Sequence, residues 1–502
     1  MHNLIILLLV LVGCKPAVEL NGDTGIDKFS FEKEAAIGLA YTFTITPDAS
    51  ANTFIIQNKD SLPQGTDVSK LKAKFSTINT LVKVKVNGVI QTSNVSVNDF
   101  TNSVIYEAYA EDGTVKKYKV FVNVAKQTLR ADKFIIINQT TFTEAEVQTI
   151  VAKYGAQSNK RVVVGLGIII SVLNSAPATF LDKLNNQLAL AKKYDIPILV
   201  KLDTEYYWDY RPDLWNWWDS SIAGYNPDNK NNVEWSDWTS DAAIKICWLN
   251  WGKQIRKRPA PNLMSPTYIN AWKTELVKGA QAVKTWYDQL PENKKFLLAG
   301  VVVGWESSIG ANLFYIPNGN SYLTQPEAND PAIKRNMDML PSRGVQATGY
   351  AAVKTAGIAS SGTLTEQMLT EVVRRHLENL SKTVFDLGFA RNQIIVHCGG
   401  WAVGETLYSA ANNAYSCPGW SFYSDAADPT KDLTAMAALA KSDAPYWAAI
   451  EWLLQGTDKT QSDWTNALNK SIANKSRLVC IYNWGQINSN LAALEAIKSI
   501  NK

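Results

Sequence analysis

Residues 297–310 read "LLAGVVVGWESSIG", and this stretch guides the interpretation of the whole chain. A nearly continuous apolar run is typical of a strand that is buried on both faces. This run ends in Trp305 and Glu306. A carboxylate at the end of a buried strand is unfavourable unless the charge reaches a polar cavity. The stretch therefore raises the question of whether other strands end in the same way.

Similar apolar runs alternate with amphipathic segments from residue 130 onward. Strands are expected at seven places, namely 133–139, 161–172, 196–208, 296–306, 393–401, 446–454 and 477–485. Repeated strand–helix units predict a parallel sheet with helices outside it. We predict a (β/α)8 barrel over 130–502, with the eighth strand between Glu306 and His397, near "RGVQATGYAAV" at 343–353.

The region 27–127 has a different pattern, in which apolar and polar residues alternate with a period of two. This alternation predicts an all-β domain. Its last hairpin, "AEDGTVKKYKVFV" at 110–122, resembles that of the immunoglobulin-type β-sandwiches in Bacteroidetes surface lipoproteins. The region contains no Trp, so a spacer role is favoured over sugar binding.

The first residues, "MHNLIILLLVLVGC", are interpreted as a targeting segment. The apolar run from Leu4 to Val12 is too short to span a bilayer. The segment resembles a bacterial lipoprotein signal, which implies a signal peptide at 1–13, a lipidated Cys14 and a linker at 14–26. An ordinary secretory signal is the alternative. The expected location is the bacterial cell envelope, lipid-anchored at the outer membrane, on its periplasmic or cell-surface face.

Composition excludes several classes of function. The net charge is only +4 and there is no basic run, so nucleic acid is not an expected partner. The 3 His and 5 Cys show no metal-ligand spacing, and Gly165 and Gly167 lack the third glycine of a dinucleotide site. No metal or cofactor is expected. Cys398 and Cys480 are expected to be buried thiols, and a disulfide with Cys417 is possible.

The strand ends share a chemistry of carboxylates and aromatic rings. The residues concerned are Asp203, Glu205, Tyr206, Trp208, Trp305, Glu306, His397, Trp401, Glu451, Trp452, Asn483 and Trp484. In a barrel these C-terminal ends meet on one face, where the active sites of this fold lie. Two carboxyl groups together with indole faces predict a site that cleaves sugars.

This pattern resembles the clan A retaining glycoside hydrolases, which are built on (β/α)8 barrels. The resemblance implies Glu306 as the acid/base at the end of strand four and Glu451 as the nucleophile at the end of strand seven. It also implies Trp484 as a platform below the sugar. The family usually has Asn before its acid, where this chain has Trp305, so the contact with the sugar 2-hydroxyl falls to another group, with Asn483 a candidate.

Alternatives stay open for several residues. Glu205 is a rival for either catalytic position, and the segment around Glu451 also fits an amphipathic helix. The Trp-rich insertion at 206–238 and the loop "YSCPGWSFY" at 415–423 are expected to mix ligand contacts, Trp420 included, with a small core. Glu405 is a candidate at the rim, and "NPDNKNN" at 226–232 a candidate calcium loop.

The sequence thus predicts a retaining glycoside hydrolase that acts on a glycan or polysaccharide. A glycan-binding surface lipoprotein without catalysis is the first alternative. A barrel enzyme of another class, such as an inverting hydrolase, is the second.

Overall fold

The computed structural model divides into two compact units, Met1–Gln127 and Thr128–Lys502. It describes residues 20–31, 43–59, 61–62, 66–124, 131–158, 160–174, 176–205, 208, 210–245, 247–250, 254–257, 259–309, 348–399 and 405–501. The predicted signal peptide and Cys14 lie outside these residues. Among the helices that are described, none has both the length and the apolar character needed to cross a bilayer.

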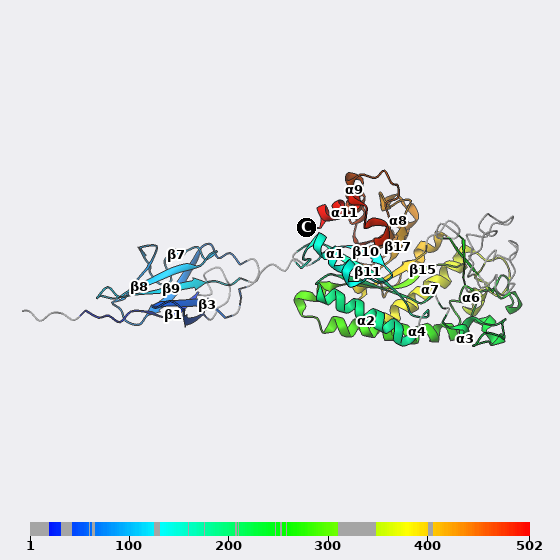
Figure 1. Ribbon diagram of the computed structural model, residues 1–502, viewed down its shortest axis with the longest axis horizontal. Helices are drawn as coiled ribbons and strands as arrows, with labels where there is room; N and C mark the ends of the chain where they lie inside the picture. The colour runs from blue at the N-terminus through cyan, green and yellow to red at the C-terminus, as the bar shows by residue number, and fades with distance from the viewer. Residues whose placement is uncertain are drawn as a thin grey trace, which may run out of the picture. The chain divides into compact units, whose positions relative to one another are not determined.

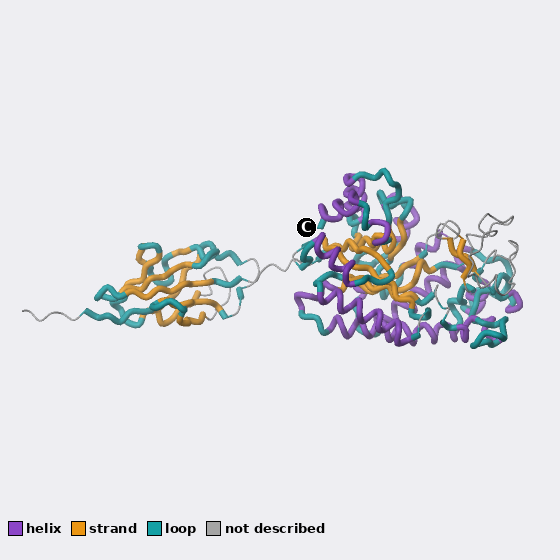
Figure 2. Tube along the Cα trace, in the orientation of Figure 1, coloured by secondary structure: helices purple, strands orange, loops and turns teal. Residues whose placement is uncertain are grey.

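The first unit is built from two sheets, as the alternating pattern predicts (Figures 1 and 2). One sheet has the order β1 (Ile26–Phe31), β4 (Leu71–Thr77), β7 (Val97–Asn98). The other has the order β2 (Phe43–Pro47), β3 (Thr53–Asn58), β9 (Val115–Phe121), β8 (Val104–Tyr109), β5 (Lys83–Val86), β6 (Val89–Ile90). All these pairs are antiparallel except β3–β9. Both sheets contribute to one core, in which Phe29 packs edge-on against Phe31 and Tyr106.

The second unit contains a parallel sheet of eight strands. In chain order these are β10 (Lys133–Gln139), β11 (Val162–Ser171), β12 (Ile198–Asp203), β15 (Leu298–Ser307), β16 (Ile394–Cys398), β17 (Gly419–Phe422), β18 (Trp447–Trp452) and β19 (Ser476–Tyr482). Each strand lies beside its predecessor in this order, and β19 returns to pair with β10. The predicted barrel is confirmed.

The barrel closes between β16 and β17 through Cys417, the residue two positions before β17. The Val396 amide donates to the Cys417 carbonyl at 3.0 Å, and the Cys417 amide donates to the Ile394 carbonyl at 2.9 Å. The strand missing from the prediction is therefore β17, which is the sixth barrel strand along the chain. It lies inside the segment interpreted above as a loop. The prediction of a strand near 343–353 is wrong in its described part, because residues 350–355 form the helix α6 (Tyr350–Thr355).

Helices cover the outside of the barrel, and α2 and α4 lie side by side (Figure 1). The longer ones are α1 (Glu144–Tyr154), α2 (Pro177–Lys193), α4 (Pro266–Asp288), α7 (Glu366–Phe385), α8 (Leu433–Ala440), α9 (Gln461–Ser471) and α11 (Leu491–Ile500). The Thr143 side chain caps α1 by accepting a hydrogen bond from the Glu146 amide.

Short elements fill the connections. They are α3 (Pro212–Trp215), α10 (Trp484–Ile487), the hairpin β13 (Cys247–Asn250) and β14 (Gln254–Lys257), and the 3-10 turns η1 (Pro227–Asn231), η2 (Ser240–Ala242), η3 (Glu292–Leu297), η5 (Arg391–Gln393), η6 (Glu405–Ala411) and η7 (Pro429–Lys431).

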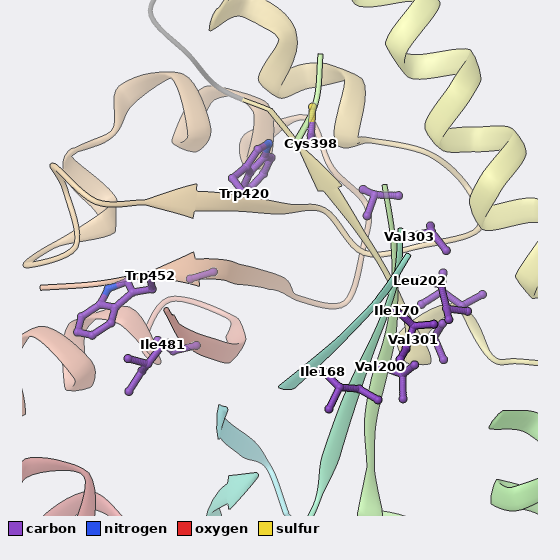
Figure 3. Close-up of a cluster of buried hydrophobic side chains, with 14 of the residues drawn as sticks. Ile168, Ile170, Val200, Leu202, Val301, Val303, Cys398, Trp420, Trp452 and Ile481 are labelled. Atoms are coloured by element: carbon purple, nitrogen blue, oxygen red, sulfur yellow. The ribbon is translucent and has the colours of Figure 1, made fainter. Parts of the chain in front are cut away.

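Alternate residues of each barrel strand serve two separate cores. Figure 3 shows part of the outer core, where Ile168, Val200 and Val301 of neighbouring strands lie close together beneath the helices. The inner core consists of strand residues that face the barrel axis, with contributions from the residues flanking β17 and β18. Cys398 and Cys480 are buried free thiols, as predicted, and Cys417 is free as well.

The two glycines of β11 have a packing role. A Cβ at Gly167 would lie 2.7 Å from Ile136 Cγ2 and 3.0 Å from Asn138 Oδ1. A Cβ at Gly165 would lie 2.8 Å from both Ile136 Cδ1 and the Pro197 carbonyl. Side chains of β10 occupy the space that side chains at Gly165 and Gly167 would need. The Gly-x-Gly pattern of β11 is therefore explained by packing inside the barrel.

We expect Gly167→Ala to destabilise the protein by about 1–3 kcal/mol, because the new methyl group must displace closely packed neighbours. Thermal and urea unfolding would measure the loss. Gly279→Ala in α4 is the matched control: its Cβ would make ordinary contacts, the nearest at 3.4 Å, and a helical Gly→Ala change gains helix propensity. Equal stability of the two variants would contradict this account.

Candidate active site

Glu306 occupies an irregular strand end. The pairing of β15 with β16 shifts between Val303 and Ser307, and both Gly304 (φ 83°) and Glu306 (φ 45°) have left-handed backbone. A Cβ at Gly304 would lie 2.7 Å from Leu377 Cδ2, so a glycine is required there. Such irregularities often redirect side chains beside active sites. Here the Glu306 carboxyl comes to lie against β17.

A chain of hydrogen bonds leads away from Glu306. The Ser421 hydroxyl donates to Glu306 Oε1 at 2.6 Å and lies 2.9 Å from His397 Nε2. Burial raises the pKa of Glu306 to about 8, and the negative charge of Glu451 adds to this effect. Burial also holds the pKa of His397 well below its usual value, and the nearby Lys201 charge contributes. At neutral pH, Glu306 is therefore a protonated acid beside an uncharged imidazole.

Glu451 has a different environment, although it is equally buried. It lies in β18, so the prediction of a strand is confirmed against the helical alternative. The Tyr423 hydroxyl donates to Glu451 Oε2 at 2.7 Å. The Lys201 ammonium lies 3.9 Å from Glu451 Oε1 and donates to the Ile450 carbonyl at 2.9 Å. A cation and a hydroxyl donor thus face this carboxylate, one at each oxygen.

Two tyrosines stand beside the pair of carboxyl groups. Burial raises the pKa of Tyr423 far above its usual value, and the charges of Glu451 and Glu306 act in the same direction. Burial raises the pKa of Tyr482 as well. The two rings meet edge-on, with 6.4 Å between their centroids. Both phenols stay protonated at neutral pH and can serve as hydrogen-bond donors.

Asp203 and Glu205 lie at the end of β12, but their contacts lead in another direction. Asp203 accepts hydrogen bonds from the Ser171 hydroxyl at 2.7 Å and the Glu205 amide at 2.8 Å. Glu205 accepts a hydrogen bond from Ser307 and lies 3.0 Å from His376 Nε2 in α7. Glu205 is therefore paired with the helix layer, whereas Glu306 and Glu451 interact with each other.

Three predicted sugar-stacking tryptophans are in the protein core instead. Trp208, Trp420 and Trp452 are at most 1% exposed, and their indole N–H groups donate to the carbonyls of Pro259, Tyr408 and Ala426. Buried rings with satisfied N–H groups cannot stack on a ligand. In the insertion, the same kind of bond to backbone carbonyls is made by Trp215, Trp217, Trp235 and Trp238. These four tryptophans connect the backbone of the insertion to itself and to neighbouring segments.

The remaining predicted residues are placed as follows. Trp305 (8% exposed) and Trp484 (6% exposed) stay at the ends of β15 and β19. Asn483 caps α10 by accepting from the Gln486 amide at 3.2 Å. Tyr206, Trp401 and the Glu405 side chain lie outside the described residues. The predicted calcium segment forms the turn η1, and within the described parts of the chain no cluster of metal-ligating side chains occurs.

Three site residues were missed from the sequence. Ser421 and Tyr423 belong to the unrecognised strand β17 and the residue after it. Their alternation with Trp420 and Phe422 was the available signal, but four residues are too few to reveal a period. Lys201 is the single basic residue inside "ILVKLD", and a lysine within a fully buried strand was the available signal.

No protein-family model matches this chain, and no curated relative matches it. Solved structures match it in fold. A GH5-4 broad-specificity endoglucanase from an uncultured bacterium is 9% identical, with 72% of this chain and 85% of that chain covered and a TM-score of 0.35.

Two further matches have similar values. The catalytic domain of a β-amylase from Paenibacillus polymyxa is 9% identical over 74% of this chain and 98% of that chain, with a TM-score of 0.42. A GH5 xyloglucanase from Bacteroides ovatus is 8% identical over 91% and 99%, with a TM-score of 0.35. Likeness at this level carries no functional argument, so the function is argued from this chain's own residues.

We expect the Glu306 carboxyl to titrate near pH 8, as its surroundings indicate. In Glu451→Gln its pKa should fall but stay above the usual 4.5, because the repulsion is removed while burial, the larger cause, remains. Carboxyl 13C NMR of glutamate-labelled protein would measure both values, with Glu306→Gln to assign the signal. A Glu306 that titrates near 4.5 in the unaltered protein would contradict the described environment.

Proposed function

We propose that this protein is a glycoside hydrolase of the retaining type, with Glu306 as acid/base and Glu451 as nucleophile. The observation that carries the proposal is the contrast between two neighbouring buried carboxyl groups. Glu306 has a pKa raised to about 8, whereas Glu451 faces an ammonium group and a hydroxyl donor. Where two neighbouring carboxyl groups have surroundings that differ in this way, one is suited to act as acid and the other as base or nucleophile.

The proposed mechanism uses these two groups in turn. Glu306 donates its proton to the glycosidic oxygen while Glu451 attacks the anomeric carbon, so the leaving sugar departs as a neutral alcohol. Water then attacks the glycosyl–Glu451 ester, Glu306 takes a proton from that water, and Glu451 leaves as a carboxylate. The hydrogen bond from Tyr423 stabilises Glu451 in its charged form before attack and after release.

The strand positions support the same assignment. Glu306 is in the fourth and Glu451 in the seventh of the eight barrel strands in chain order. These are the positions that the resemblance to clan A implies for acid/base and nucleophile. Trp305 and Trp484, which keep a small exposed fraction at the strand ends, are the proposed aromatic contacts with the sugar.

Two variants test the catalytic assignment against a panel of polysaccharides, including xyloglucan, and 2,4-dinitrophenyl glycosides. Glu306→Gln should lower turnover of unactivated substrates by about 10²–10⁴-fold, because proton transfer to the leaving group is lost. Glu451→Gln should abolish turnover of both kinds of substrate. Reducing-sugar release and dinitrophenol release measure the two reactions, and Glu378→Gln on the outside of α7 is the control.

Three results would overturn parts of this proposal. Full activity of Glu451→Gln would reject the nucleophile. Sugar binding by calorimetry with no product from any substrate would favour a non-catalytic glycan-binding protein. An inverted anomer as first product, followed by 1H NMR, would replace the retaining mechanism with an inverting one.

We also propose that the chain is a lipoprotein of the bacterial cell envelope, anchored through Cys14 and carrying an immunoglobulin-like spacer before the barrel. The lipobox-like "LVGC" at 11–14 supports the anchor, and the two sheets that share one core support the spacer domain. The first unit contains no Trp, which favours a spacer role over sugar binding.

Cys14→Ser should release the protein from the membrane fraction, because the thiol that would receive the lipid is removed. Fractionation of a bacterial host that processes lipoproteins, followed by detergent phase partitioning, would show this change. Cys398→Ser, at a buried free thiol, is the control and should leave the protein with the membranes. An unlipidated chain with its signal removed at another position would identify an ordinary secretory signal.

A further inference from the structure

Lys201 is an unusual residue for the interior of a barrel. On β12 the outer core takes Val200 and Leu202, so Lys201 faces the barrel axis together with Leu199 and Asp203. Among the described residues, it is the one Lys or Arg side chain that is buried. Removing an ammonium group from water costs several kcal/mol unless charges and hydrogen bonds compensate for it. The question is what this cation does there.

Two of its polar contacts lie on one short piece of β18, and the Cys480 thiol of β19 is a further polar neighbour. The ammonium donates to the Ile450 carbonyl at 2.9 Å and lies 3.9 Å from Oε1 of the next residue, Glu451. One side chain therefore contacts both the backbone that carries Glu451 and the carboxylate itself. The β18 strand is irregular here, because its pairing with β19 shifts between Ala449 and Trp452. A fixed contact at this irregularity fixes the direction of the Glu451 side chain.

We infer that Lys201 is a positioning residue that uses its charge and its hydrogen bond to the Ile450 carbonyl to hold the Glu451 carboxylate in place for attack. The inference rests on the proposed function and adds to it the residue that makes the two carboxyl groups unequal. A charged neighbour within this distance, in an interior of low dielectric, acts far more strongly than it would in water. The same charge also favours the neutral form of the His397 imidazole.

The charged and titratable groups around this pair come from several strands. Those facing Glu451 or Lys201 are Glu306 of β15, His397 of β16, Tyr423 after β17, and Cys480 and Tyr482 of β19. Burial raises the pKa of the thiol and of both phenols, and His397 is held neutral. Lys201 is thus the one cation among these groups, so none of the others can supply a positive charge beside Glu451.

The test measures the first chemical step alone. With a 2,4-dinitrophenyl glycoside the leaving group needs no acid, so the pre-steady-state burst of dinitrophenol reports the attack by Glu451. Lys201→Met removes the charge and the hydrogen bond. Lys201→Gln removes the charge but keeps an N–H donor. Lys278→Met, on the outer helix α4, is the control.

We expect the burst rate to fall by about 10²-fold in both Lys201 variants, with an acidic limb of its pH profile moved to higher pH. Glu306→Gln should keep a rapid burst. A Lys201→Gln variant with a normal burst and normal acidic limb would show that the lysine has only a structural role, and would overturn the inference while the proposed function stands. A normal burst in Glu451→Gln would instead reject the proposed function itself.

Circular dichroism and thermal melting establish whether the variants fold. If neither does, carboxyl 13C NMR of the unaltered protein decides the matter, with Glu451→Gln for assignment. The inference requires Glu451 to be ionised at a pH at which Glu306 is protonated. Finding both groups protonated there would overturn it.

Discussion

Two carboxyl groups that share one buried space repel each other and lose their hydration, and this conflict governs the catalytic end of the barrel. Burial and the charge of Glu451 together drive the pKa of Glu306 to about 8. The conflict is resolved by giving the two groups different neighbours: a serine hydroxyl for Glu306, and an ammonium with a phenol for Glu451. The same side-chain type can serve as acid and as nucleophile where the surroundings differ in this way, as we propose for Glu306 and Glu451.

The barrel creates these surroundings by irregularity as much as by regular pairing. Strand registers shift beside both carboxyl groups, at Val303–Ser307 in β15 and at Ala449–Trp452 in β18. The β17–β18 pairing shifts at the same level, between Trp420 and Ser421. Regular alternation alone assigns side chains to the axis or to the helix layer. The bulges redirect Glu306, Glu451 and Ser421 within that scheme, so that groups from three strands come within hydrogen-bond or Coulomb range.

The sequence predicted the barrel well, because long apolar runs identify strands that are buried on both faces. The strand predicted at 133–139 coincides with β10. The four-residue strand β17 was not recognised, because its Gly and aromatic residues, with Pro418 directly before them, resemble a loop and four positions cannot show a period. Several tryptophans were predicted to contact the ligand, because composition does not distinguish a ring that is buried in the core from a ring that stacks on a sugar. Trp452 follows a catalytic candidate in sequence, but the strand pleat sends its ring into the outer core.

The residues that differentiate the two carboxyl groups are remote from them in the chain. Lys201 lies on β12, Ser421 on β17 and Tyr423 directly after β17. None of the three is adjacent in sequence to Glu306 or Glu451. The residues next to Glu306 and Glu451 in the sequence therefore account for only part of the environment of each carboxyl group. The rest depends on strand neighbours: the pairing of β17 with β18 brings Tyr423 beside Glu451, and closure between β16 and β17 brings Ser421 within reach of Glu306. A change that loosens this closure would remove the Ser421 hydrogen bond from Glu306 while leaving both carboxyl groups in the chain.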